Sequence, residues 1–179
     1  MCGIIGIKHD SPFFSWLPNL IEQNQKRGKS SKIEFTTPNG RFFHFRAPTS
    51  GCSLHNLSEA YPITYKGYGL IGNGIINEKY FKSIKDEENN NDLYYILKGF
   101  TEKGSKFLEM VEGCFALVIF TPRGEIFLIK NTFPIYYNNS IFSSVKFGNS
   151  QLLKDGILYD WVKNKKIEQI DTKLPPYLT

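Results

Sequence analysis

The sequence has few of the residues and runs that identify several protein classes. It contains only three cysteines, Cys2, Cys52 and Cys114, an odd number without CxxC spacing, which argues against a disulfide framework and a zinc site. No apolar run approaches the roughly 20 residues of a membrane-spanning helix, and no charged-then-apolar segment opens the chain as a signal peptide would. We therefore expect a soluble protein of the cytoplasm, or of the host cytoplasm if a virus encodes it.

The sequence also lacks a concentrated basic surface, although its net charge is +5, from 22 Lys and Arg against 17 Asp and Glu. Its densest basic patch holds Lys163, Lys165 and Lys166, and Asp160 and Glu168 flank it. A phosphate-binding track needs basic residues gathered along one face without acidic neighbours. This patch is more typical of a solvated face, and we do not expect nucleic acid as a direct partner.

The chain does contain enough apolar material for a core: 41% of its 179 residues are hydrophobic and 15% are aromatic. This length predicts a single domain over residues 1–179. Short β-branched and aromatic runs between turn signals predict strands over 2–8, 32–37, 41–46, 68–71, 113–120 and 125–130, with further strands within 136–145. Helices are expected over 17–26, 78–85 and from 92, with a short one over 107–110 and a long loop over 47–62. Hairpins with helices between them favour an α+β fold of layered antiparallel sheets over a parallel Rossmann sheet.

Cys2 is the first residue in the chain with a side chain that suits catalysis. If Met1 is removed, which a small second residue permits, Cys2 carries both a thiol and a free α-amino group. The amine can accept a proton at neutral pH, so the residue contains a nucleophile and its base. The alternative is that Cys2 is a small buried residue of the first strand, because cysteine is among the most buried residue types.

Several downstream segments stand in a definite order after this start. The start itself is Met1-Cys-Gly-Ile-Ile-Gly-Ile7, and the segments after it are Gln25-Lys-Arg-Gly-Lys-Ser-Ser31, His44-Phe-Arg-Ala-Pro-Thr-Ser-Gly51, Tyr61-Pro-Ile63 through Gly72-Asn-Gly-Ile-Ile-Asn77, Asn91-Asp92 and Val111-Glu-Gly-Cys-Phe-Ala-Leu-Val118. Together they resemble the class II glutamine amidotransferases, a family of N-terminal nucleophile (Ntn) hydrolases with cysteine at mature position one. The resemblance covers about residues 1–136 and leaves a C-terminal extension of about 148–179. It implies a four-layer αββα sandwich of two antiparallel sheets between helix layers.

The matched residues also suit the chemistry of glutamine. Arg46 offers a planar, charged fork for the α-carboxylate, and Asp92 at a helix start offers a carboxylate for the α-ammonium group. The side-chain amide of Asn73 and the backbone N–H of Gly74 are expected to form an oxyanion hole for the charge that develops on the amide oxygen. The alternatives are an exposed strand arginine for Arg46, a helix N-cap for Asp92 and an ordinary Asn-Gly turn for Asn73 and Gly74.

Other roles come from the resemblance alone. It implies that Thr49 and Ser50 hydrogen-bond the bound amino acid, and that Arg27, followed by Gly28, braces the N-terminal site.

The sequence departs from the family pattern at two places. Lys29-Ser30 replaces a segment that usually contains aspartate, and Ala47 replaces an aromatic residue that often follows the carboxylate-binding arginine. His44 is expected to be a packed strand residue, and His9 and His55 to be surface or loop groups. We expect neither a metal nor a cofactor.

The resemblance implies a glutaminase subunit that hydrolyses the side-chain amide of L-glutamine through a thioester on Cys2. Because little of the chain lies beyond the matched region, we expect a separate synthetase or transferase protein to accept the ammonia. A catalytically silent amidotransferase-like binding or assembly module is the main alternative. A related Ntn hydrolase acting on another amide is a third, although such a substrate leaves Arg46 and Asp92 without a purpose.

Overall fold

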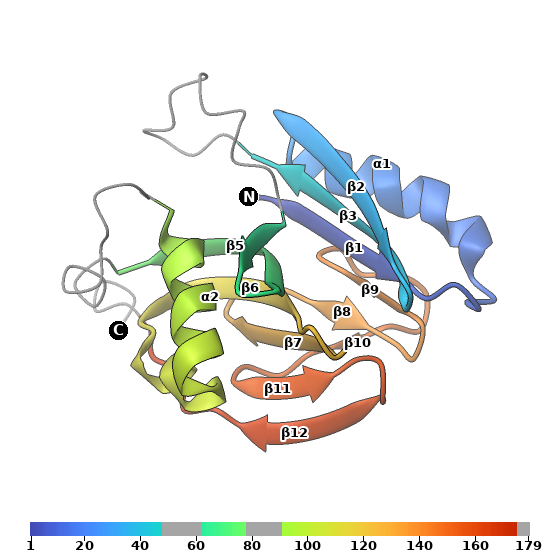
Figure 1. Ribbon diagram of the computed structural model, residues 1–179. Helices are drawn as coiled ribbons and strands as arrows, with labels where there is room; N and C mark the ends of the chain where they lie inside the picture. The colour runs from blue at the N-terminus through green and yellow to red at the C-terminus, as the bar shows by residue number, and fades with distance from the viewer. Residues whose placement is uncertain (48–61, 78–90, 175–179) are drawn as a thin grey trace. The chain divides into compact units, whose positions relative to one another are not determined.

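A computed structural model describes residues 1–47, 62–77 and 91–174 of the chain. Its contacts group the chain into two compact units, one of residues 1–61 and 134–153 and the other of residues 62–133 and 154–179. Within the described residues, each unit contains one antiparallel six-stranded sheet and one α-helix of 11 or 12 residues (Figure 1). The expected α+β class with two antiparallel sheets is therefore confirmed, while a single domain over 1–179 stays a prediction.

The first unit is built around its N-terminal strand. Its elements are β1 (Gly3–Ile7), η1 (Phe14–Trp16), α1 (Leu17–Arg27), β2 (Ser31–Thr37), β3 (Gly40–Arg46), β8 (Tyr136–Tyr137), β9 (Ile141–Ser143) and β10 (Gln151–Leu152). The strand order is β10-β8-β9-β1-β3-β2, so β1 lies between two neighbours and all five of its residues are buried. Chain ends usually fray, and here pairing on both sides prevents it.

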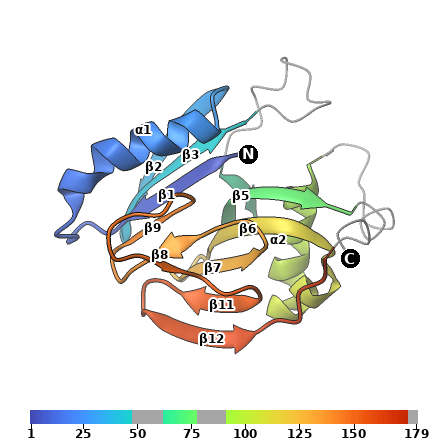
Figure 2. The same cartoon turned by 180° about the vertical axis from the view of Figure 1, so that it is seen from behind.

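Helix α1 lies along β1 and β3 at close range (Figure 2). A Cβ atom added at Gly3 would stand 2.5 Å from the carbonyl oxygen of Asn24 in α1, so only glycine permits this approach. The buried Asn24 amide donates hydrogen bonds to the Leu20 carbonyl and to the Ser143 hydroxyl in β9, both at 2.9 Å. Leu17 and Leu20 of α1 complete a core with β1, β3 and β9.

The second unit places a glycine-rich strand beneath its helix. Its elements are β4 (Ile63–Tyr65), β5 (Tyr68–Ile76), α2 (Asp92–Lys103), η3 (Ser105–Met110), β6 (Gly113–Phe120), β7 (Ile126–Asn131), β11 (Ile157–Asp160) and β12 (Lys165–Gln169), in the sheet order β12-β11-β7-β6-β5-β4. The four apolar residues that predicted α2 are all buried, namely Leu93, Ile96, Leu97 and Phe100. Cβ atoms added at Gly72 and Gly74 would lie 3.4 and 3.1 Å from the Leu93 side chain, so α2 begins directly over β5.

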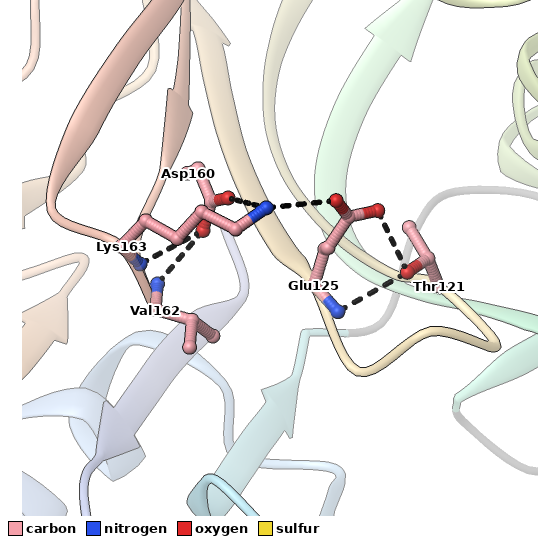
Figure 3. A network of polar contacts seen from close by, with 5 residues as sticks. All are labelled: Thr121, Glu125, Asp160, Val162 and Lys163. Atoms are coloured by element: carbon pink, nitrogen blue, oxygen red, sulfur yellow. Dashed lines mark hydrogen bonds and ion pairs between the residues drawn. The ribbon is translucent and has the colours of Figure 1, made fainter.

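A buried carboxylate connects two hairpins at one end of this second sheet (Figure 3). Asp160, which is fully buried, accepts hydrogen bonds from the backbone N–H groups of Val162 and Lys163 at 3.0 and 3.1 Å. The Lys163 ammonium lies 3.3 Å from Asp160 and 3.0 Å from Glu125 in the β6–β7 turn. These partners raise the pKa of Lys163, with Glu125 contributing most. Lys163 is thus a counter-ion to Asp160 while its own side chain stays 58% exposed, and Lys165 and Lys166 are exposed too, as expected for a solvated face.

The sequence pattern did not predict the short strands β4, β10, β11 and β12, which have two to five residues each. It also ended β5 at residue 71, five residues early, because Gly72 and Gly74 interrupt the β-branched pattern. The expected helix over 78–85, and all of the expected loop over 47–62 except its first and last residues, lie outside the described residues. Within the described ranges, no helix is long and apolar enough to cross a membrane.

Gly3→Ala should destabilise the protein by about 1–3 kcal/mol, because the added methyl group must displace α1 from β1. Gly69→Ala is the matched control, since its Cβ would meet only ordinary contacts at 3.6 Å and beyond, and it should change stability by less than about 0.5 kcal/mol. Urea denaturation measures both free energies of unfolding. Equal values for the two variants would contradict the packing described for Gly3.

Candidate active site

Cys2 is held at the start of β1 by the end of β3. Gly3 pairs with Phe45, so Cys2 and Arg46 are the next residues along two adjacent antiparallel strands. The Cys2 side chain is buried, and its Sγ accepts a hydrogen bond from the backbone N–H of Ala47 at 3.5 Å. A backbone donor aimed at the sulfur stabilises a thiolate, which is the nucleophilic form of cysteine.

Arg27, the last residue of α1, reaches back to the same place. Its Nε–H donates to the carbonyl oxygen of Cys2 at 3.4 Å, and its Nη2 lies 3.7 Å from the sulfur of Met1. Burial lowers the pKa of the Arg27 guanidinium, while Coulomb attraction from Cys2 and Tyr136 acts in the opposite direction. Met1 itself is 61% exposed.

Gly28 and Ser30 fix the backbone at the end of β3. A Cβ atom at Gly28 would lie 2.1 Å from the carbonyl oxygen of Phe45, so the chain after α1 passes β3 at a distance that only glycine permits. Ser30 donates two hydrogen bonds to the Arg46 carbonyl, from its N–H at 3.0 Å and from its hydroxyl at 2.6 Å. The departure from the family pattern at Lys29-Ser30 therefore supplies a contact to Arg46.

Asn73 and Gly74 lie inside β5, which excludes the Asn-Gly turn that the sequence left open. Asn73 pairs with Ala116 and Gly74 with Phe115 of β6. The Asn73 side chain is 8% exposed and forms no hydrogen bond with another described residue. Its position between Gly72 and Gly74, which face Leu93, places it on the sheet face opposite α2.

Besides the Asn73 side-chain amide, β5 has backbone N–H groups that can donate hydrogen bonds along its outer edge. Strand β4 pairs only with Tyr68 to Leu70, so among the described residues no strand covers the outer edge of residues 71–76. Consecutive residues of an antiparallel strand direct their N–H groups to opposite sides. Of the Asn73 and Gly74 backbone N–H groups, one therefore points to β6 and the other to this edge.

Asp92 is the first residue of α2, and the helix N-cap is its neighbour Asn91. The Asn91 side chain accepts the Leu93 N–H at 3.0 Å, and Oδ1 of Asp92 accepts the same N–H at 2.9 Å. The N-cap alternative for Asp92 is therefore wrong. Its carboxylate lies instead at the positive end of the helix dipole, which stabilises its charge.

The structure thus brings the expected residues together in two groups. Cys2, Arg27, Gly28 and Arg46 are neighbours in the first unit. In the second unit Gly74 and Asp92 lie beside Leu93 at the start of α2, while Asn73 occupies the opposite face of β5. Thr49 and Ser50 lie outside the described residues, as do Cys52 and His55. Among the described residues, no three His, Cys, Asp or Glu side chains gather as a metal site would require.

The sequence pattern did not predict two contacts at this site, the Ala47 hydrogen bond to Cys2 and the Ser30 hydrogen bonds to Arg46. The Ala47 donor is a backbone group, which has no sequence signal of its own, and Ser30 was recognised only as a missing aspartate. His44 was correctly expected to be packed, since its side chain is buried in β3. His9 is exposed, as expected, and its ring lies 2.9 Å from the Thr37 carbonyl.

Comparison with solved structures shows which known protein has a similar fold. No family model and no curated protein matches the sequence. Among solved structures, the chain is similar to the glutamine phosphoribosylpyrophosphate amidotransferase of B. subtilis complexed with ADP and GMP, with a TM-score of 0.63 and 15% identity over 94% of this chain. The chain spans 49% of the length of that protein. The likeness shows the fold alone: this chain has an α+β fold with two antiparallel sheets, of the Ntn-hydrolase type.

Replacement of Arg27 tests the electrostatic environment of Cys2. Arg27→Met should slow the alkylation of Cys2 by iodoacetamide several-fold, because the guanidinium that attracts the thiolate is lost. Lys26→Met is the control, since Lys26 forms its ion pair with Glu22 on the exposed side of α1. Peptide mass mapping assigns the modified cysteine. Equal alkylation rates in both variants and the wild type would show that Arg27 has no electrostatic role at Cys2.

Proposed function

We propose that this protein is a glutaminase of the amidotransferase type, which hydrolyses the side-chain amide of L-glutamine through Cys2. One observation carries the proposal: the Cys2 sulfur accepts a backbone hydrogen bond from Ala47 while Arg27 holds the Cys2 carbonyl. A buried structural cysteine does not require a donor at its sulfur and a cation at its backbone. The amidotransferase-type fold supports the same conclusion.

The proposed nucleophile requires removal of Met1. The exposure of Met1 and the small size of Cys2 both favour cleavage by an aminopeptidase. Cleavage creates an α-amino group on Cys2 beside its own thiol, so that the amine serves as the base. The hydrogen bond from Arg27 to the Cys2 carbonyl does not involve Met1 and holds the residue in both forms.

In the proposed reaction, the Cys2 thiol gives its proton to the α-amine, and the sulfur attacks the side-chain carbonyl carbon of glutamine. The C–N bond then breaks, the α-ammonium returns a proton to the departing nitrogen, and ammonia leaves a glutamyl thioester. Water attacks the thioester with the α-amine as base, releasing glutamate and the free thiol. Atoms and charges balance without a cofactor.

The remaining residues bind the substrate and its developing charge. We assign the α-carboxylate of glutamine to Arg46 and its α-ammonium group to Asp92, with Thr49 and Ser50 as additional hydrogen-bond partners. The Asn73 amide and the Gly74 N–H serve as donors to the oxyanion. In support, the Asn73 amide is not engaged by another described residue, and β5 holds it rigidly.

The acceptor of the ammonia is also part of the proposal. The B. subtilis protein is an amidotransferase of about twice the matched length, because the alignment covers 49% of it. We assign the acceptor reaction of the present protein to a separate synthetase or transferase.

Covalent labelling tests the nucleophile. An electrophilic glutamine analogue such as 6-diazo-5-oxo-L-norleucine should modify Cys2 and leave Cys52 and Cys114 unmodified, with glutamine protecting against the reaction. Cys2→Ser, with the same shape and a far weaker nucleophile, should not be labelled. Labelling at another cysteine, or none in protein that lacks Met1, would favour the silent binding module instead.

Asn73→Ala tests the oxyanion donor. Its kcat for glutamine hydrolysis should fall by about 10²- to 10³-fold with little change in KM, because the donor acts mainly on charge that develops in the transition state. Asn77→Ala is the control, as Asn77 follows the same strand but bonds to Glu112 at 2.9 Å. Unchanged turnover in Asn73→Ala would reduce Asn73 to a structural residue.

A further inference from the structure

A cavity of about 470 Å³ opens in the first unit on the side of α1. Its lining comes from η1, α1 and the turn after β9, namely Ser15, Trp16, Asn19, Gln23, Lys146 and Phe147, with Leu20 and Gly148. This volume lies in the usual range for small-molecule sites, which are lined mainly by apolar and aromatic groups with a few polar ones. None of these residues belongs to the proposed glutaminase machinery.

An aromatic wall forms one side of the cavity. Phe13 stacks on the Trp16 ring with centroids 4.5 Å apart, and Phe147 meets Trp16 edge-on at 6.1 Å. Gly148 has φ of +35°, and a Cβ there would lie 2.4 Å from the Trp16 ring, so the turn adopts a glycine-specific conformation against the indole. The wall is thus fixed in place, and a planar ring can stack on it or meet it edge-on.

The charged group that lines the cavity is a cation. Of the described residues that line it, Lys146 is the single charged one; it is exposed and forms no ion pair with another of them. Ser15 adds a hydroxyl donor, while Asn19 and Gln23 hold each other by a hydrogen bond of 2.6 Å. A single ammonium group with neutral donors balances one negative charge, which suits a carboxylate better than a phosphate monoester of charge between about −1.5 and −2.

We infer that this cavity binds a small aromatic monocarboxylate, with its ring against Trp16 and Phe147 and its carboxylate on Lys146. The inference does not depend on Cys2 chemistry. It concerns the part of α1 around Asn19 and Gln23, and Arg27 lies one turn further along, at the last residue of the same helix.

Phenylacetate is a suitable probe, measured by calorimetry and by tryptophan emission. The chain has two tryptophans, and Trp161 is fully buried, so Trp16 reports on the cavity. We expect saturable binding of phenylacetate with a change in emission that Trp16→Phe abolishes. The neutral analogue phenylacetamide and the ring-free anion acetate should each bind at least about tenfold more weakly, since each lacks one of the two contacts.

Lys146→Met should weaken phenylacetate binding by about tenfold or more, whereas Lys154→Met, another exposed lysine outside the cavity, should not. Both changes are on the surface, so the fold is retained. Absence of saturable heat and emission change in the millimolar range would overturn the proposal, and so would equal affinity for phenylacetamide or full affinity in Lys146→Met. A failure here leaves the glutaminase proposal untouched, because labelling of Cys2 tests that independently.

Discussion

The antiparallel pairing of β1 with β3 is the constraint on which the rest of this account depends. It turns the second residue of the chain, normally a mobile one, into a fixed point beside Arg46 and Ala47. Gly3 and Gly28 serve this arrangement, because a side chain at either position would push α1 or the following loop away from the strands. The proposed nucleophile at the chain terminus needs an immobilised backbone, and two glycines and a buried strand hold the backbone of Cys2 in place.

In the second unit, too, a paired strand holds a candidate site residue, here Asn73 in β5. Asn73 lies on a continuous strand between Gly72 and Gly74, and α2 begins over the opposite face of that strand, where the Leu93 side chain lies close to both glycines. Groups held by paired strands do not need to reorganise as charge develops on a substrate. The glycines that weaken the strand pattern in the sequence are therefore the residues that allow this site to be compact.

The sequence predicts those elements whose pattern lies within a few adjacent residues, and it does not predict those that depend on contacts between distant parts of the chain. The β1 strand, the β2–β3 and β6–β7 hairpins and the apolar face of α2 each depend on a few adjacent residues, and each is present as expected. Strands β10 to β12 are short, β10 and β12 are largely exposed, and pairing with distant strands defines them rather than their own pattern. The Ala47 donor and the Ser30 contact with Arg46 involve backbone atoms brought together by the fold, which no residue type encodes.

The central claim is that Cys2 becomes the N-terminal residue and carries the acyl group during turnover. Mass spectrometry of the protein, quenched with acid while it hydrolyses glutamine, tests this most directly. We expect an N-terminal peptide that begins at Cys2 and carries a glutamyl group on the sulfur, which hydroxylamine removes. Retained Met1 in protein that releases ammonia, or turnover without an acyl group on Cys2, would contradict it.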